Sequence, residues 1–262
     1  MNRTADAPDM AISPARSRGP MAEHGRRPAS PVVLSVGGSV LMRGEDDARY
    51  LVALADLLRK VGRDRPLAVT TGGGRTAREY IGLGRSLGLT EVELDELGID
   101  VTRLHARLVA GTIGLPTASH PPGSVREAVE ALRHSSPVVL GGTEPGHTTD
   151  AVAALIAVRL RAARVVNATD VDGLYDADPR SHPEARRLEA VGWPALLALL
   201  RRTTAGEPGQ RFPFDRLGAE ALARAAIPLA IVAGRDLANL EKAMAGERFE
   251  GTIVGGPGGD TA

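Results

Sequence analysis

The stretch VVLGGTEPGHTTDA (residues 138–151) decides the fold of this chain. Its three leading apolar residues are typical of a short buried strand, and the glycines and proline that follow force an irregular loop. Thr148, Thr149 and Asp150 then precede an apolar run to Leu160 that is long enough for a helix. Such a helix start presents unpaired N–H groups and a positive dipole end, which suits an anion. Taken alone, the stretch is explained equally well by a tight turn with an N-cap.

Two more loops of this kind follow apolar strands earlier in the chain. The run PVVLSV (31–36) leads into GGS, and LAV (67–69) leads into TTGGG. Glycines after a buried strand let the backbone approach a phosphate closely. Arg75 and Arg78 lie in the first turn of the helix expected after the second loop, where the dipole disfavours positive charge. Their position therefore indicates a bound anion.

Strand-like and helix-like runs alternate along the rest of the chain. We expect further strands at 164–168, 229–232 and 251–254, and helices at 47–61, 89–115, 124–136, 151–160, 194–202, 215–226 and 236–244. This alternation predicts an α/β layered fold with a mostly parallel sheet. Ligands of such sheets bind beyond the carboxyl ends of the strands, so the three loops should converge on one crevice. Two adjacent phosphate groups, as phosphoryl transfer requires, would fit there.

Composition excludes several classes of protein. The 32 basic and 32 acidic residues balance, which argues against a nucleic-acid or membrane surface as partner. Cysteine is absent, which excludes thiolate catalysis and disulfides and favours a reducing, cytoplasmic compartment. Neither a P-loop motif nor the protein-kinase motifs are present. We expect a disordered extension over 1–30, one domain over 31–255 and a flexible Gly-rich tail over 256–262.

The chain resembles the amino-acid-kinase superfamily, and specifically its archaeal-type uridylate (UMP) kinases. The segments that carry the resemblance are VGGSVL (36–41), TGGGRTAREYI (71–81), DELGIDVTRLHA (95–106), GGTEPGHTTDAVAALIA (141–157) and TDVDGLYDADP (169–179). The resemblance implies a three-layer sandwich with a mostly parallel central sheet. It also implies phosphorylation of UMP to UDP by ATP, with Mg²⁺ as cofactor, in a homo-oligomer that we expect to be a hexamer.

The resemblance further implies roles for individual residues. Arg78 would be catalytic and, with Gly74, would lie where the two phosphates meet. On the ATP side the implied residues are Gly38, Ser39, Gly74, Arg78, Thr169, Asp170, Tyr175 and Asp178. On the UMP side they are Gly73, Asp95, Thr143, Glu144, Pro145, Gly146, His147, Thr148 and Thr149. Asp95 would take the ribose hydroxyls, although without the resemblance it is better explained as a solvated helix acid. No side chain is assigned to a metal.

Four positions depart from the family's pattern. Ser35 and Glu220 stand where many members have lysine, Glu144 replaces the usual His or Val, and Asp170 replaces a common Asn. The loss of positive charge leaves three hypotheses open. The chain is a UMP kinase, a kinase for another small phosphate or phosphonate, or a nucleotide-binding protein without turnover.

Overall fold

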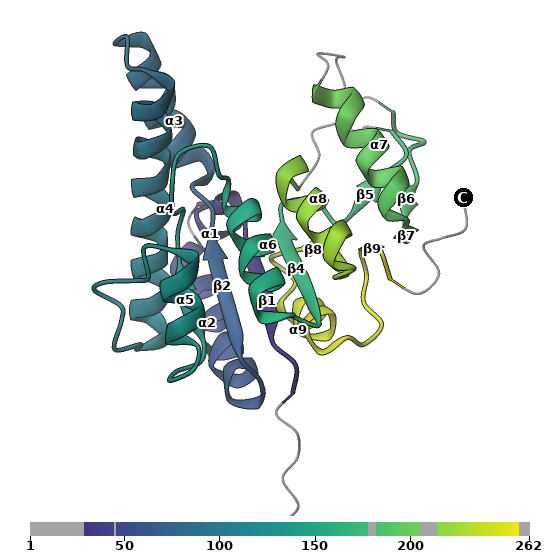
Figure 1. Ribbon diagram of the computed structural model, residues 1–262, viewed down its shortest axis with the longest axis horizontal. Coiled ribbons are helices and arrows are strands. Elements are labelled where there is room, and N and C mark those ends of the chain that lie inside the picture. The colour runs from purple at the N-terminus through teal and green to yellow at the C-terminus, as the bar shows by residue number, and fades with distance from the viewer. Residues whose placement is uncertain (1–28, 45, 178–181, 205–213, 257–262) are drawn as a thin grey trace, which may run out of the picture.

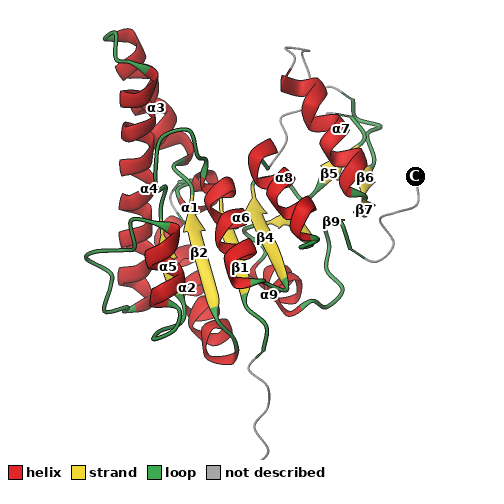
Figure 2. Ribbon diagram, viewed as in Figure 1, coloured by secondary structure: helices red, strands yellow, loops and turns green. Residues whose placement is uncertain are grey.

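Seven strands form the central sheet of the computed structural model, which describes residues 29–44, 46–177, 182–204 and 214–256 (Figures 1 and 2). Their order is β3 (Val138–Leu140), β2 (Leu67–Thr71), β1 (Val32–Val36), β4 (Arg164–Thr169), β8 (Leu229–Ala233), β9 (Thr252–Val254) and β7 (Ala190–Val191). The first five are parallel, and β9 runs antiparallel to β8. A separate antiparallel pair consists of β5 (Leu174–Tyr175) and β6 (Arg187–Leu188). The predicted, mostly parallel sheet is confirmed.

Helices cover both faces of the sheet and complete the three layers. One face carries α1 (Gly38–Leu41), α2 (Asp47–Asp64), α4 (Glu91–Ile113) and α9 (Leu237–Ala245). The other carries α5 (Val125–Ala131), α6 (Thr149–Leu160), α7 (Trp193–Thr204) and α8 (Arg216–Ala225). Helix α3 (Gly74–Ser86) packs along α4, and the pair projects beyond the sheet (Figure 1).

Alternation along β1 divides its side chains between two apolar cores. Val32, Leu34 and Val36 pack on the α2 side, whereas Val33 packs on the α6 side. All five residues of the strand are buried, as is usual for a parallel strand covered on both faces. Ser35 is the polar exception, and the same alternation turns it toward α6.

Local signals explain where α4 begins and ends. Thr90 and Glu93 form a reciprocal capping box, and Gly114 ends the helix at φ +81°. The helix predicted over 89–115 is therefore confirmed, and it contains both Asp95 and Gly98. They lie in the second and third turns of a continuous helix. The four-residue helix α1 was not predicted, because it is shorter than any detectable period.

Several sequence expectations fall on residues outside the described ranges. These are most of the N-terminal extension (residues 1–28), Asp178 and most of the tail (257–262). Across the described residues, no helix combines the length and the apolar character that a membrane crossing requires.

The first two Gly-rich loops meet backbone to backbone at the carboxyl ends of β1 and β2. A Cβ on Gly38 would lie 2.2 Å from the amide nitrogen of Gly74, and one on Gly74 would lie 2.4 Å from the carbonyl carbon of Gly38. Gly74 also has φ +58°, which L side chains rarely adopt. The contact therefore requires glycine in both loops and joins them into one backbone surface.

Replacement of Gly38 by alanine should force the two loops apart, since the new Cβ would meet backbone and not a movable side chain. We expect Gly38→Ala to lower the free energy of unfolding by more than about 1 kcal/mol. Gly82→Ala is the matched control, because a Cβ at this α3 position meets nothing within 4 Å. Alanine there should stabilise the helix by about 0.5–1 kcal/mol. Chemical denaturation measures both, and equal stability of the two variants would contradict the close approach.

Candidate active site

The third Gly-rich loop is held against α4. A Cβ on Gly141 would lie 2.6 Å from the amide nitrogen of Arg103. The Gly142 N–H donates to Thr102 Oγ1 at 2.6 Å, and the Arg103 guanidinium donates to the carbonyls of Gly142 and Thr143 at 3.1 and 3.0 Å. These contacts fix the loop at the same edge of the sheet as the other two. The predicted convergence of the three loops is confirmed.

A cavity of about 200 Å³ lies between this loop, α3 and α4. The predicted UMP-side residues that line it are Asp95, Glu144, His147, Thr148 and Thr149. Asp95 Oδ2 accepts a hydrogen bond from the Gly146 N–H at 2.8 Å, so this carboxylate ties the loop to α4. The cavity is open to solvent, so a ligand larger than its volume can extend beyond it.

Glu144 lies at the exposed rim of this cavity, beside His147. Its side chain is 65% exposed, and Oε1 lies 3.0 Å from His147 Nδ1. Thr143, next to it, has a buried hydroxyl that no partner satisfies within the described part of the chain. Because buried polar atoms are normally paired, this hydroxyl is available to a ligand that enters the loop.

Arg78, and not Arg75, faces the junction of the first two loops. The Arg78 guanidinium donates to Ser39 Oγ at 3.4 Å, across from α3 to the first loop. Arg75 instead pairs with Glu79 at 3.4 Å on the outer side of α3, with 72% of its side chain exposed. Of the two arginines predicted at this helix start, the structure therefore brings one to the phosphate side. Its catalytic role stays a prediction.

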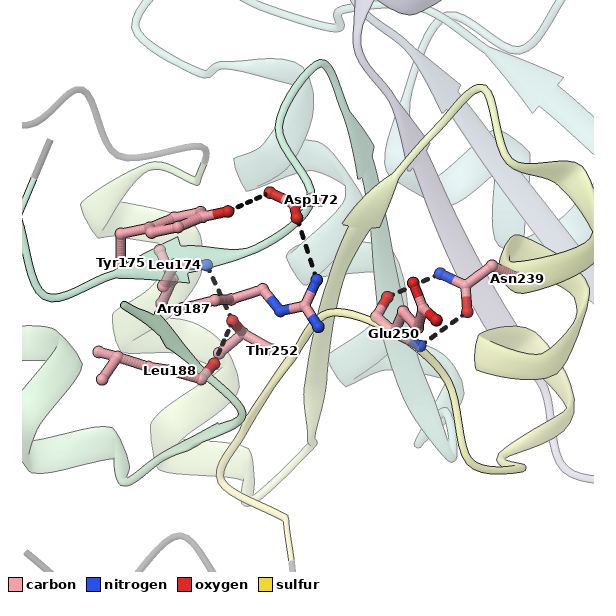
Figure 3. Close-up of polar contacts among 8 residues, drawn as sticks. All are labelled: Asp172, Leu174, Tyr175, Arg187, Leu188, Asn239, Glu250 and Thr252. Atoms are coloured by element: carbon pink, nitrogen blue, oxygen red, sulfur yellow. Dashed lines mark hydrogen bonds and ion pairs between the residues drawn. The ribbon is translucent and has the colours of Figure 1, made fainter. Parts of the chain in front are cut away.

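The residues predicted for adenosine follow β4. Thr169 donates to Asp170 at 3.2 Å, and the Tyr175 hydroxyl donates to Asp172 Oδ1 at 2.9 Å. Asp172 Oδ2 accepts from Arg187 at 3.0 Å, which links this turn to β6 (Figure 3). The hydrogen bond to Asp172 raises the pKa of Tyr175. Sequence reasoning did not single out Asp172 or Arg187 as a pair, because they lie 15 positions apart and no periodic signal connects them.

Two carboxylates that sequence reasoning assigned to no site lie at the start of α6 and α8. Ser35 Oγ donates to Asp150 Oδ1 at 2.7 Å, across 115 residues. Asp215 caps α8, accepting from the Gly218 N–H at 2.8 Å, and also accepts from the Thr148 hydroxyl. Burial, with a further contribution from the charge of Asp215, raises the pKa of Asp150 to about 7. Ser35 is therefore a hydrogen-bond donor within the site and not simply a missing lysine.

A larger hollow of about 830 Å³ lies elsewhere, along α9 and β9, and contains none of the predicted site residues. Arg187 lies at its edge, and Asn239 exchanges two hydrogen bonds with the backbone of Glu250 (Figure 3). Its four basic side chains (Arg164, Arg187, Lys242, Arg248) are matched by four acidic ones (Glu189, Asp236, Glu247, Glu250). This balance of charge favours neither an anionic nor a cationic ligand in the hollow.

The raised pKa of Asp150 makes stability depend on pH. Between its ordinary pKa of 3.8 and about 7, the folded state holds a proton that the unfolded state releases, so stability falls as pH rises through this window. Asp150→Asn should remove this slope. We expect the difference in Tm between the variant and the wild type to grow by roughly 5 °C from pH 5 to pH 8. Calorimetry at the two pH values measures it, and a constant difference would show that Asp150 ionises normally.

Comparison with known proteins gives consistent relatives. The Amino acid kinase family profile matches residues 30–233. The chain is 39% identical over 216 residues to the uridylate kinase of Methanothermobacter thermautotrophicus, covering 82% of this chain and 96% of that protein. It is 40% identical over 225 residues to the uridylate kinase of Thermoplasma acidophilum, covering 85% and 96%.

Solved structures agree. The uridylate kinase of Archaeoglobus fulgidus is 37% identical, with a TM-score of 0.75 over 85% of this chain and 99% of that one. The UMP kinase of Bacillus anthracis, at 19% identity and a TM-score of 0.70 over 90% and 98%, shares the fold. The chain belongs to the amino acid kinase family and groups there with the archaeal uridylate kinases.

Proposed function

We propose that this protein transfers the terminal phosphoryl group of ATP to UMP and releases UDP and ADP. One observation carries the proposal. The backbone junction of Gly38 and Gly74, with Arg78 beside it, adjoins the cavity bounded by Asp95 and the loop 143–149. Two Gly-rich loops able to bind phosphate, next to a cavity lined by a third loop, suit a reaction in which two nucleotides bind side by side. The named relatives support UMP as the acceptor.

The proposed reaction needs alignment and charge stabilisation more than proton transfer. The attacking oxygen of UMP is already anionic, so no general base is required. The Gly-rich loops would bring both phosphates into line, and Arg78 with the loop N–H groups would stabilise the charge of the transferring group. The hydroxyls of Thr143, Thr148 and Thr149 and the carboxylate of Asp95 would hold UMP. Thr169, Asp170 and Tyr175 would hold the adenosine side.

Mg²⁺ is part of the proposal as the cofactor that accompanies ATP. The described residues contain no group of three or more His, Cys, Asp or Glu side chains able to hold a metal. This fits Mg²⁺, which commonly keeps several waters and binds mainly to substrate phosphates. When bound, it would neutralise phosphate charge.

An assay of ADP release with Mg·ATP tests the acceptor. We expect fast turnover with UMP and little with CMP, dUMP, isopentenyl phosphate or no acceptor. Turnover with another acceptor would assign the change in specificity to the loop 143–149. Tight ATP binding without turnover would support the nucleotide-binding alternative, which the absence of lysine at Ser35 and Glu220 motivates.

Arg78→Ala should lower kcat by more than about 10-fold, because a charge-stabilising contact is typically worth several kcal/mol in the transition state. Arg85→Ala is the matched control on the same helix, since Arg85 pairs with Glu91 at the far end of α3. Unchanged kinetics in the Arg78 variant would remove Arg78 from the mechanism.

A homo-oligomer, expected as a hexamer, also belongs to the proposal. The projecting α3–α4 pair exposes a set of large apolar side chains: Tyr80, Leu83, Leu87, Val92, Leu104 and Leu108. Apolar side chains gathered on one helical pair commonly mark a protein interface. A second copy of this chain could cover these apolar side chains and pair with the exposed charged residues among them, such as Asp100 and Arg107. A cytoplasmic location stays a prediction that rests on the absence of cysteine.

Leu83→Asp should break this interface, because a buried unpaired charge is costly. In sedimentation velocity the wild type should run at six times the chain mass of 27.3 kDa, and the variant as a smaller species. Val52→Asp is the control, since Val52 is equally exposed but lies on α2. A monomeric wild type would contradict the proposal.

A further inference from the structure

Two carboxylates, Asp150 and Asp215, lie at the starts of α6 and α8, where they contact β1 and the third Gly-rich loop. Within the residues that the structure describes, neither forms an ion pair or a hydrogen bond with a basic side chain. Asp150 accepts from the Ser35 hydroxyl, and Asp215 accepts from a hydroxyl and a backbone N–H. Both belong to the same corner of the molecule, because the tightly packed N-terminal turns of α6 and α8 carry them. A Cβ on Gly218 would lie 3.2 Å from the Asp150 carbonyl oxygen.

The sheet beneath Asp150 offers no compensating charge. Ser35 is in register with Thr70 of β2 and Asn167 of β4, and alternation turns all three toward α6. None of these side chains titrates. The other charged groups on elements packed against α6 are Glu144, His147, Arg164, Arg216, Glu220, Arg224, Arg126, Glu127 and Glu130. Glu144 lies beside His147, Arg216 lies 3.6 Å from Glu220, and Glu127 accepts from the Gly123 N–H.

Bound nucleotides would add phosphate charge to this corner. Like charges in a partly desolvated site repel strongly, so one carboxylate must be neutralised. Asp215 accepts from two donors, one of which is the backbone N–H that it caps. Asp150 has one hydroxyl donor, and its Oδ2 has no partner among the described residues. Asp150 is therefore the group that takes up a proton.

We propose that Asp150 carries a proton when both nucleotides are bound, and that its neutral carboxyl group donates a hydrogen bond to a phosphate oxygen at the loop junction. The proton comes from solvent and resides on Oδ2, since Oδ1 accepts from Ser35. The neutral carboxyl group of Asp150 then donates to phosphate in a site where Ser35 and Glu220 replace the family's lysines and Arg78 is the cation. The inference rests on the proposed function, because it takes UMP and ATP as the two phosphate carriers.

The first test compares Asp150→Asn with the wild type in kcat/KM for UMP from pH 6 to pH 9. An asparagine stays neutral and keeps an N–H donor at every pH. Ionisation of UMP and ATP affects both enzymes equally, so the ratio of variant to wild type isolates Asp150. We expect this ratio to rise with pH and to approach a 10-fold increase per unit above about pH 8. A ratio that does not change with pH would overturn the proposal, as would loss of activity at every pH, which would show that the ionised carboxylate is required.

Ser35→Ala tests the partner of Asp150. Removing a donor to the ionised carboxylate should move the alkaline fall in wild-type kcat/KM to higher pH, a change that a merely structural role of Ser35 would not produce. Glu130→Gln is the matched control, because it removes an exposed carboxylate on α5 that pairs with Arg133 and does not line the cavity. It should leave the midpoint in place. A midpoint unmoved by Ser35→Ala, or moved as much by Glu130→Gln, would contradict the proposal.

A second measurement separates this proposal from the proposed function. Calorimetric binding of a non-hydrolysable ATP analogue with UMP at pH 8, in buffers of different ionisation enthalpy, counts the protons taken up. The wild type should take up close to one proton more than Asp150→Asn. If nucleotides bind with this difference and no turnover occurs, the kinase function fails and the protonation of Asp150 stands. Equal uptake overturns the protonation whatever the turnover, and absence of nucleotide binding overturns both.

Discussion

Backbone contact between Gly38 and Gly74 is the constraint on which the rest of the site depends. Parallel neighbours β1 and β2 end at the same edge, and only residues without Cβ let the loops after them touch. The contact aligns the start of α3, and Arg78 on that helix then reaches Ser39 on the first loop. Neither loop alone would form a surface for two phosphates. Because the two loops touch, a phosphoryl donor and a phosphoryl acceptor could bind side by side on one chain.

The third loop lies beside this surface. It is positioned by α4 through Thr102 and Arg103, and it is tied to the same helix by Asp95, about two helix turns earlier. The same helix therefore contacts the loop at two points, through Thr102 and Arg103 and through Asp95. Asp95 uses Oδ2 to accept from Gly146, and its other carboxylate oxygen is available to the ribose hydroxyls that we propose it binds.

Much of the fold follows from the sequence, whereas the finer chemistry of the site does not. Apolar runs such as 31–36 and 138–140 gave their strands, and the glycines after them gave the converging loops. Periodicity could not distinguish Arg75 from Arg78, because residues three apart lie on nearly the same face of a helix. Only the folded structure shows that Arg75 pairs with Glu79 and that Arg78 reaches Ser39. The Ser35–Asp150 bond joins residues 115 apart, and Asp215 reaches Thr148 across 67. Such pairs arise from tertiary packing and leave no local pattern.

We propose that the three loops form a single site for two nucleotides. The most direct measurement is equilibrium binding of a bisubstrate compound in which the ATP and UMP moieties are joined through one additional phosphate. We expect one molecule of this compound to bind per chain, much more tightly than either nucleotide alone, and both ATP and UMP should displace it. The affinity should be high because joining the two nucleotides removes most of the entropic cost of binding the second nucleotide. Displacement by only one nucleotide, or an affinity no better than that of ATP, would contradict a shared site.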